Sequence, residues 1–502
     1  MTDIARPVPP KAPAAEVRID SGRLRGRIEG DVAVFRGVPY AAPPVGQLRW
    51  RAPQPVAPWK GVRPALAFGF DGFHVEDPGD PLAGTQPHGE DCLTLNVWRP
   101  AKRPAAPASV LVWIHGGGFT NGAASAATYD GAAFARRGLV VVTINYRLGR
   151  FGFFAHQALT REAGGERVGN FGLMDQVAAL EWVRRNITAF GGDRGNVTIM
   201  GESAGGWSVN MLMTSPPARA LFHRAVAESA GGRVGTFGKS LVSWPKAQEI
   251  GETFAAHHGV AGGDAAALAA LRALPAEALQ VAPFFIAPRD TYSGPMVDGW
   301  LVPKDPGAAF AEGAVAPVPY LVGCNSREVD DMVEARPMAA ALLKAAGPGA
   351  AAALARAYGD ADAAEAGLMG DIVFVEPARY TARCMADRAA AAPVYLYRFG
   401  YVPQAYAAQL KGAAHTTEVQ FVFDKTGSAD ARDLAVGRMM NGYWANFVRS
   451  GDPNGPGLAP WPRFDRAGGE LLFIDRDGSA RASADPKAAI LDALAAAPFD
   501  PA

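Results

Sequence analysis

Short runs of β-branched and apolar residues alternate along the chain with longer segments in which apolar residues recur at helical spacing. The apolar runs predict strands at 93–98, 110–114, 139–145, 196–200, 225–228, 318–323, 393–399 and 470–474. The helical spacing predicts a helix over 171–187, and alanine-rich stretches predict others over 246–258, 264–274, 338–358, 376–390 and 430–449. Strands that alternate with helices favour an α/β fold, with a large, mostly parallel central sheet wrapped by helices.

No linker, repeat or charge run divides the chain, although 502 residues would usually form two or three domains. We therefore predict one domain over 1–502, with the alanine-rich helices of 240–390 as helical insertions. The segments 345–366 and 486–497 are expected to be plain helices. Lys+Arg and Asp+Glu both number 49, so the net charge is zero, which argues against nucleic acid or an anionic membrane surface as partner.

The first 16 residues are rich in proline and alanine and contain no apolar run typical of a secretory signal. No segment of the sequence approaches the ~20 consecutive apolar residues of a membrane span. We expect a cytoplasmic protein, or a secreted or periplasmic one if a leader has been removed. The three cysteines, Cys92, Cys324 and Cys384, match no metal-binding spacing, so we expect free thiols and no metal site.

Residues 201–206 read Gly-Glu-Ser-Ala-Gly-Gly and lie between the strand predicted at 196–200 and a segment that can continue as a helix. This arrangement predicts that Ser203 occupies a sharp, strained turn with its hydroxyl exposed, while the flanking glycines let strand and helix pass closely. The helix N-terminus adds free N–H groups near the hydroxyl. The pattern also occurs in ordinary surface turns, so its context decides the interpretation.

An exposed serine needs a base, and on this kind of turn the partners follow in the order Ser, acid, His. Of the eight histidines, only four follow the serine, and only His415 also follows a strand that can present an acid. Glu328 fits the acid best, because it lies just beyond the strand predicted at 318–323. Three other carboxylates remain rivals for that role: Asp330, Asp331 and Asp371.

A glycine run, His115-Gly-Gly-Gly-Phe119, follows the strand predicted at 110–114. Such a run is either a flexible turn or a loop whose backbone N–H groups face a developing negative oxygen. Beside a serine turn we favour the second interpretation, with the N–H groups of Gly117, Gly118 and Ala204 as donors. His115 is then expected to fix the loop rather than to act as a second base.

Several longer motifs extend the pattern over nearly the whole chain. They lie at 35–41, 48–50, 90–98, 113–119, 145–149, 169–176, 190–193, 444–447 and 451–454, the third of them reading Glu-Asp-Cys-Leu-Thr-Leu-Asn-Val-Trp. With these motifs the chain resembles the type-B carboxylesterases of the cholinesterase/carboxylesterase family, and in particular the bacterial branch similar to para-nitrobenzyl esterase.

The resemblance implies an α/β-hydrolase fold, no cofactor, and hydrolysis of small-molecule carboxylic esters through an acyl-enzyme. It implies Ser203 as nucleophile, Glu328 as the triad acid and His415 as the base. It assigns the oxyanion hole to Gly117, Gly118 and Ala204. It also places Glu202 and Ser229 at buried polar positions beside the triad.

The sequence departs from the family in three ways. Val329 follows the acid where the family usually has glycine. Cys92 has no cysteine upstream, so the disulfide of secreted relatives cannot form and we expect the loop 66–89 to be less tethered. The same loop contains no tryptophan, the residue with which cholinesterases bind a quaternary ammonium, so a choline ester is disfavoured.

Aromatic residues supply candidates for the wall of a substrate pocket, although core packing explains each of them equally well. The candidates are Phe119, Trp207, Phe73, Phe284 and Phe285, with Phe68 and Phe70. They favour short- to medium-chain or aryl esters. A carbamate or amide hydrolase, an enzyme for one specialised ester such as a toxin or antibiotic, and a non-catalytic binding homologue stay open. So does the choice between monomer and homodimer.

Overall fold

The computed structural model describes residues 14–74, 83–231, 233, 241–281, 291–388, 392–465, 469–497 and 499. Its centre is a 13-stranded sheet with the strand order β1-β2-β3-β7-β9-β8-β10-β11-β14-β15-β16-β17, and β4 pairs with β2. The strands are β1 (Ala14–Ile19), β2 (Gly22–Glu29), β3 (Val32–Pro39), β4 (Val62–Pro64), β7 (Thr94–Pro100), β8 (Ala108–Ile114), β9 (Val140–Ile144), β10 (Gly192–Glu202), β11 (Arg224–Glu228), β14 (Tyr320–Asn325), β15 (Val394–Phe399), β16 (Glu470–Ile474) and β17 (Ala480–Ala484).

The seven strands from β9 to β16 are all parallel, whereas antiparallel pairs extend the sheet at both sides. Every residue of β9, β14 and β15 is buried, as expected for strands covered on both faces. This confirms the predicted α/β fold with a large, mostly parallel sheet. Four short strands pair outside the main sheet: β5 (Asp71–Gly72) with β6 (His88–Gly89), and β12 (Val242–Ser243) with β13 (Met296–Val297).

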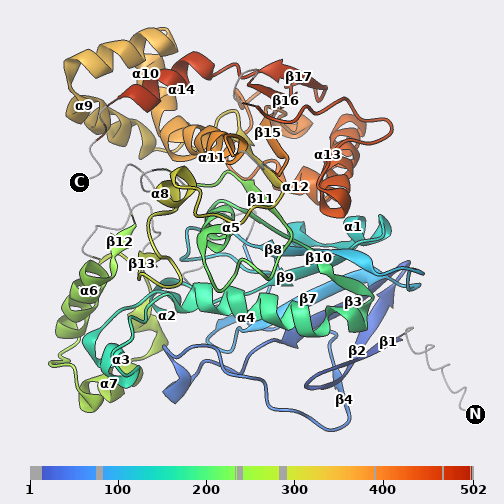
Figure 1. Ribbon diagram of the computed structural model, residues 1–502, viewed down its shortest axis with the longest axis vertical. Coiled ribbons are helices and arrows are strands. Elements are labelled where there is room, and N and C mark those ends of the chain that lie inside the picture. Colours follow the sequence, from blue (N-terminus) through green and yellow to red (C-terminus); the bar gives the residue numbers. More distant parts are fainter. Residues whose placement is uncertain are drawn as a thin grey trace, which may run out of the picture.

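Helices cover both faces of the sheet and continue into two peripheral groups. They are α1 (Ala132–Arg136), α2 (Gly149–Gly152), α3 (Gln157–Glu162), α4 (Phe171–Asn186), α5 (Ala204–Thr214), α6 (Trp244–His257), α7 (Ala265–Arg272), α8 (Pro306–Ala311), α9 (Ala335–Tyr358), α10 (Ala361–Gly370), α11 (Glu376–Ala386), α12 (Val419–Val422), α13 (Ala431–Ser450) and α14 (Ala488–Ala496). Figure 1 shows α3, α6 and α7 grouped at the lower left and α9, α10 and α14 grouped at the top.

The core consists of two clusters that explain this layering. One contains the apolar side chains of α4, α5 and α11, and the other contains those of α1, α12 and α13. Alternate side chains of the central strands fall into the two clusters, because successive residues of a strand point to opposite faces. In β8, for example, Val112 belongs to the first cluster and Trp113 to the second.

The alanine-rich region departs from the predicted plain helix over 345–366. The chain breaks at Gly347, where φ is 85° and ψ 164°, just before Pro348, and again at Gly359, where φ is 108°. Pro348 cannot continue the hydrogen bonds of the preceding turn, and glycine tolerates the positive φ. Sequence reasoning missed both breaks because alanine favours a helix on either side of them.

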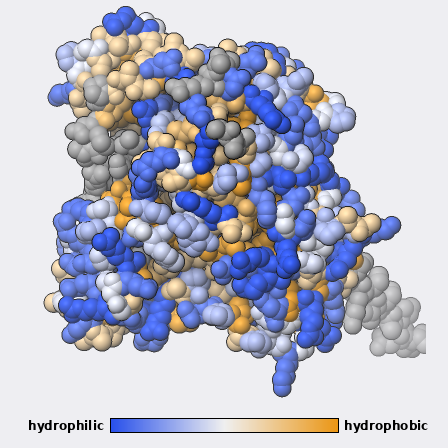
Figure 2. All heavy atoms as spheres, viewed as in Figure 1, coloured by the Kyte–Doolittle hydropathy of each residue, from blue (hydrophilic) through white to orange (hydrophobic). Residues whose placement is uncertain are grey.

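Helix α9 is long and apolar enough, by length and composition, to cross a membrane, although the sequence was expected to contain no such segment. Its break at Gly347 divides it into two pieces, each shorter than the ~20 residues that a span needs. One such helix is weak evidence for a span. Figure 2 shows a weakly hydrophobic surface over α9 and α10, where alanine predominates.

The order of the strands determines where a site can form. The carboxyl ends of β8, β10, β11 and β14 are neighbours at one edge of the parallel part of the sheet. The glycine run follows β8, Ser203 follows β10, Ser229 follows β11, and Glu328 lies three residues beyond β14. In open α/β sheets, ligands bind at this edge.

Candidate active site

Ser203 forms the turn between β10 and α5, with φ 56° and ψ −121°. Its N–H donates to the Glu228 carbonyl at 2.9 Å, which ties the turn to β11. A Cβ on Gly205 would lie only 2.0 Å from the Ile114 carbonyl oxygen, so only glycine lets α5 begin so close to β8. The structure confirms the predicted strand–turn–helix, with a strained serine at its apex.

His415 joins the serine to the acid. Its Nε2 lies 2.9 Å from the Ser203 Oγ, and its Nδ1 lies 2.7 Å from Glu328 Oε2. The His415 N–H also donates to the Glu328 carbonyl at 2.8 Å, so backbone and side chain hold the two residues in register. An Nδ1–H that donates to the carboxylate leaves Nε2 free to accept the serine proton.

The Glu328 carboxylate is buried and fully hydrogen-bonded. Its Oε1 accepts from the Ser229 hydroxyl and from the Asn325 N–H, both at 2.7 Å. Burial alone would raise the pKa of Glu328, but the hydrogen bond and charge of His415, with these two donors, outweigh burial and hold the pKa below its ordinary value. The unusual Val329 packs into the core without disturbing this geometry.

The three rival acids lie elsewhere. Asp331 pairs with Arg327 at 2.9 Å, and Asp330 lies 3.8 Å from the same guanidinium. Asp371 pairs with Lys487. The structure therefore brings Glu328, rather than any rival, to His415.

The glycine run lies against the serine turn. A Cβ on Gly116 would lie 3.1 Å from the Ser203 Cβ, so the loop and Ser203 are in contact. Gly117 and Gly118 have φ 100° and 58°, which turns the backbone back on itself. Within the described residues, the N–H groups of Gly117, Gly118 and Ala204 donate no hydrogen bond to the protein. This is the state expected of donors for an oxyanion.

His115 fixes the glycine run, as expected from the sequence. Its ring stacks on Tyr146 with centroids 4.5 Å apart, and its Nδ1 lies 2.8 Å from the Gly116 carbonyl. The Tyr146 hydroxyl donates to the His115 carbonyl at 2.9 Å. Burial lowers the pKa of His115 to about 4, so the ring is neutral.

Backbone strain is concentrated at this site. Six described non-glycine residues have positive φ, and Phe119, Ser203, Ser229 and Thr416 are four of them. Each adjoins or belongs to the glycine run, the serine turn, the end of β11 or His415. Such conformations persist only where the surrounding structure enforces them, and they cluster at functional sites.

Three further buried carboxylates surround the triad. Glu202 Oε1 lies 3.3 Å from His415 Nε2, and Glu228 Oε1 accepts from the Trp444 indole at 2.5 Å. Burial and the charge of Glu418 hold the pKa of Glu228 well above its ordinary value. Burial and the charge of Glu328 raise the pKa of Glu418 to about 7. A raised pKa favours the uncharged form of a carboxyl group, so burial reduces the negative charge that Glu228 and Glu418 bring to the surroundings of the triad.

Glu202→Gln should shift the acid limb of the kcat/KM profile to lower pH by about one unit. Burial opposes protonation of His415, but the charges of Glu202 and Glu328 outweigh burial and raise its pKa to about 9. Protonated His415 cannot accept the serine proton, so a lower pKa extends activity to lower pH. The pH profile for a p-nitrophenyl ester tests this, with exposed Glu312→Gln as the control. A limb that stays in place or moves to higher pH contradicts the prediction.

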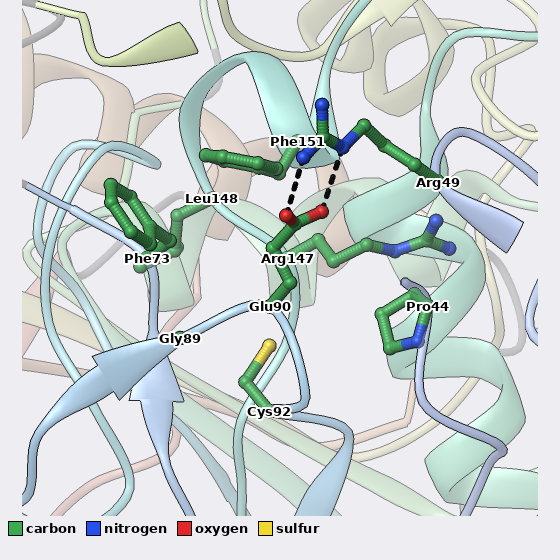
Figure 3. Close-up of a pocket in the computed structure, with 9 residues that line it drawn as sticks. All are labelled: Pro44, Arg49, Phe73, Gly89, Glu90, Cys92, Arg147, Leu148 and Phe151. Carbon is green, nitrogen blue, oxygen red and sulfur yellow. Dashed lines mark hydrogen bonds and ion pairs between the residues drawn. The ribbon is translucent and has the colours of Figure 1, made fainter. Parts of the chain in front are cut away.

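Of the seven predicted pocket residues, Phe68 packs against the second core cluster and Phe70 is exposed. The other five divide into three groups. Phe119 and Trp207 lie with their ring centres 6.0 Å apart beside the glycine run and the serine turn, and the backbone N–H of Trp207 donates to the Ser203 carbonyl at 2.8 Å. Phe73 instead packs on Phe151 at 5.3 Å, in a separate small cavity (Figure 3). Phe284 and Phe285 lie outside the described residues.

The small cavity in Figure 3 also contains the buried, free Cys92. Arg49 and Glu90 face each other there in a two-pronged ion pair, with contacts of 2.5 and 2.8 Å. At the other end of the loop, Asp71 accepts from Ser125 at 2.8 Å. Polar contacts thus hold the chain at Asp71, within the loop 66–89, and at Glu90, just beyond it, while the expectation that the loop is less tethered than in secreted relatives stays a prediction.

Sequence reasoning missed Glu228, Glu418 and Phe374, the last of which stacks on His415. Glu418 follows His415 by three residues, a signal that could have identified it. Glu228 closes an apolar strand, where a charged residue is unusual. Among the residues that the structure describes, no group of three or more His, Cys, Asp and Glu side chains is arranged to hold a metal ion.

Comparison with known proteins agrees with this geometry. The model of the Carboxylesterase family matches residues 13–347 and 352–490. Fumonisin B1 esterase of Sphingopyxis macrogoltabida is 35% identical, with 91% of this chain and 86% of that protein covered. Para-nitrobenzyl esterase of Bacillus subtilis (strain 168) is 34% identical, with 91% and 94% covered. Carboxylesterase 1E of Mus musculus is 35% identical, with 91% and 90% covered. The chain therefore belongs to the carboxylesterase family, the serine hydrolases of carboxylic esters with an α/β-hydrolase fold.

Proposed function

We propose that Ser203, His415 and Glu328 hydrolyse carboxylic esters through a covalent acyl-enzyme. The observation that carries this proposal is the unbroken chain of hydrogen bonds from the Ser203 Oγ through both nitrogens of His415 to Glu328, at 2.9 and 2.7 Å. A serine hydroxyl is a poor nucleophile until a base within hydrogen-bond reach takes its proton. Glu328, held ionised by its donors, stabilises the imidazolium that then forms.

In the first half of the reaction Ser203 Oγ attacks the ester carbonyl carbon while its proton passes to His415 Nε2. The carbonyl oxygen becomes negative and meets the N–H groups of Gly117, Gly118 and Ala204. His415 then protonates the departing alkoxide, which leaves as the alcohol. In the second half a water repeats the attack on the acyl carbon and releases the acid. Each N–H of the oxyanion hole typically contributes about 10²–10³ in rate.

For the substrate class we propose uncharged esters with short- to medium-chain or aryl groups. The largely apolar rings of Phe119 and Trp207 beside Ser203 support this, since an uncharged acyl or aryl group can pack on them without the desolvation cost that a charged group carries. A quaternary ammonium is disfavoured because the loop 66–89 contains no tryptophan.

Two experiments test the proposal together. A fluorophosphonate probe should label the wild-type protein at Ser203, as mass spectrometry of the labelled peptide would show. p-Nitrophenyl esters of increasing chain length should be hydrolysed with ping-pong kinetics and faster than a matched choline ester. Absence of labelling would instead favour a non-catalytic binding homologue, and a preference for the choline ester would overturn the substrate class.

A specialised ester is the second candidate, supported by the relative named fumonisin B1 esterase at 35% identity. A carbamate or amide hydrolase on the same triad is the third. Matched aryl ester, carbamate and anilide substrates test this third candidate, because the ester and the carbamate release the same phenol from different acyl groups, whereas the anilide releases an aniline. We expect the ester to have the highest kcat/KM, and a faster carbamate or anilide would reverse the assignment.

A further inference from the structure

A π-helical turn, Asp371–Val375, lies against the catalytic histidine. It joins α10 to α11, and its Phe374 is almost fully buried, with 7% of its surface exposed. The Phe374 ring stacks on the His415 imidazole, with centroids 4.5 Å apart and planes tilted by 33°. π-Helical turns are rare and occur frequently at functional sites.

The polar contacts of His415 leave its imidazole ring one kind of motion. Glu328, Ser203 and Glu202 all contact the ring nitrogens, at 2.7, 2.9 and 3.3 Å, and so act at the edge of the imidazole. Contacts at the edge do not stop the ring from tilting out of its plane. A stacked aromatic face opposes that tilt, and it also attracts the imidazolium cation that forms during the reaction.

The turn is anchored by elements far away in the sequence. Asp371 is fully buried, and its carboxylate pairs with Lys487, which directly precedes α14. The hydroxyl of Tyr358, the last residue of α9, donates to the other Asp371 oxygen at 2.8 Å. The charge of Lys487 and the Tyr358 hydroxyl thus hold the first residue of the turn, while Phe374 meets His415 near its end.

We propose that Phe374 is a positioning residue for His415 and that the Asp371–Lys487–Tyr358 cluster fixes Phe374 in place. This inference rests on the proposed function, because it takes His415 as the base. The ring keeps the imidazole aimed first at the Ser203 hydroxyl and then at the leaving group. Its π face stabilises the protonated form that exists between those two steps.

Phe374→Leu removes the aromatic face and keeps the site apolar. We expect kcat to fall about tenfold with little change in KM, since the almost fully buried Phe374 leaves little surface for a substrate to contact. The pKa of His415, followed by NMR, should fall by about half a unit, and the acid limb of kcat/KM should move with it. The titratable groups facing His415, namely Glu202, Glu328 and Glu418, are unchanged in this variant. A residue that only supports the fold would not move this pKa.

Phe374→Tyr is the matched aromatic variant and should keep both kcat and the His415 pKa near the wild-type values. Equal impairment of the leucine and tyrosine variants would overturn the proposal, as would wild-type kcat and pKa in the leucine variant. The NMR titration needs no turnover. Its result therefore stands apart from the labelling and ester assays, which alone decide the proposed function.

Lys487→Met tests the anchor. The groups that face Asp371 are Lys487, Tyr358, Asp330 and Arg398, and this variant removes the cation that pairs with it. We expect a smaller fall in kcat and a smaller shift of the same sign in the His415 pKa. Combined with Phe374→Leu, it should cause no further change in kcat or in the His415 pKa, because both substitutions act through the Phe374 ring.

Lys304→Met, at an exposed ion pair with Glu312, is the control. Additive effects would contradict the anchor, and if the leucine variant fails to fold, an unshifted His415 pKa in Lys487→Met overturns the proposal.

Discussion

Replacing Ser203 by alanine is expected to lower kcat for a p-nitrophenyl ester by about 10⁴- to 10⁶-fold, while the protein stays folded. Without the hydroxyl that lies 2.9 Å from His415 Nε2, no acyl-enzyme can form. His415→Ala should cause a loss of similar size, because the hydroxyl then has no general base. The activity that remains in either variant comes from the oxyanion hole and from substrate binding.

The double variant Ser203→Ala/His415→Ala should be no slower than either single variant, since the two residues act as a unit. Turnover, fluorophosphonate labelling and thermal unfolding of all three proteins test this. Ser483→Ala, on the edge strand β17, is the matched control and should behave as the wild type. Turnover above about one hundredth of the wild-type rate in either single variant contradicts the assignment.

The sequence allowed the triad to be predicted because Ser203 and Glu328 closely follow parallel strands, β10 and β14, and His415 lies in the segment after the next one, β15. Glycines around Ser203 mark a strand–turn–helix, and the order Ser, acid, His leaves His415 as the one histidine placed after a suitable strand. The boundaries of the central strands were predicted well for a different reason. A strand that is buried on both faces is a continuous apolar run in the sequence, which is easy to recognise.

Contacts between distant segments could not be predicted in this way. Phe374 lies in an apolar stretch that gives no sign of a π-helical turn, and its position over His415 depends on Lys487, more than a hundred residues later. Likewise, no local pattern indicates that Arg49 and Glu90 form the ion pair that holds the loop near Cys92. Pairing between single side chains far apart in the sequence leaves no periodic signal.

Gly205→Ala is expected to lower the free energy of unfolding by about 3 kcal/mol or more and to abolish most of the activity. The new Cβ would lie 2.0 Å from the Ile114 carbonyl oxygen and 2.8 Å from that of His115, both of them backbone atoms. Neither can rotate aside as a side chain does, so α5 must move away from β8. Because β8 leads into the glycine run and α5 begins at Ala204, that movement separates the proposed oxyanion donors from one another.

Gly349→Ala is the matched control, since a Cβ there would meet no atom within 4 Å and the residue lies in α9. It should leave activity unchanged and stabilise the protein slightly, by about 0.5–1 kcal/mol, because alanine favours a helix over glycine. Chemical denaturation and ester turnover are measured for both variants. Their comparison separates the general effect of an added methyl group on stability and activity from its effect where α5 passes close to β8. If Gly205→Ala has the same free energy of unfolding as the wild type, α5 can move away from β8 without a loss of stability. That result would show that glycine is not needed at this position for the close approach of helix and strand.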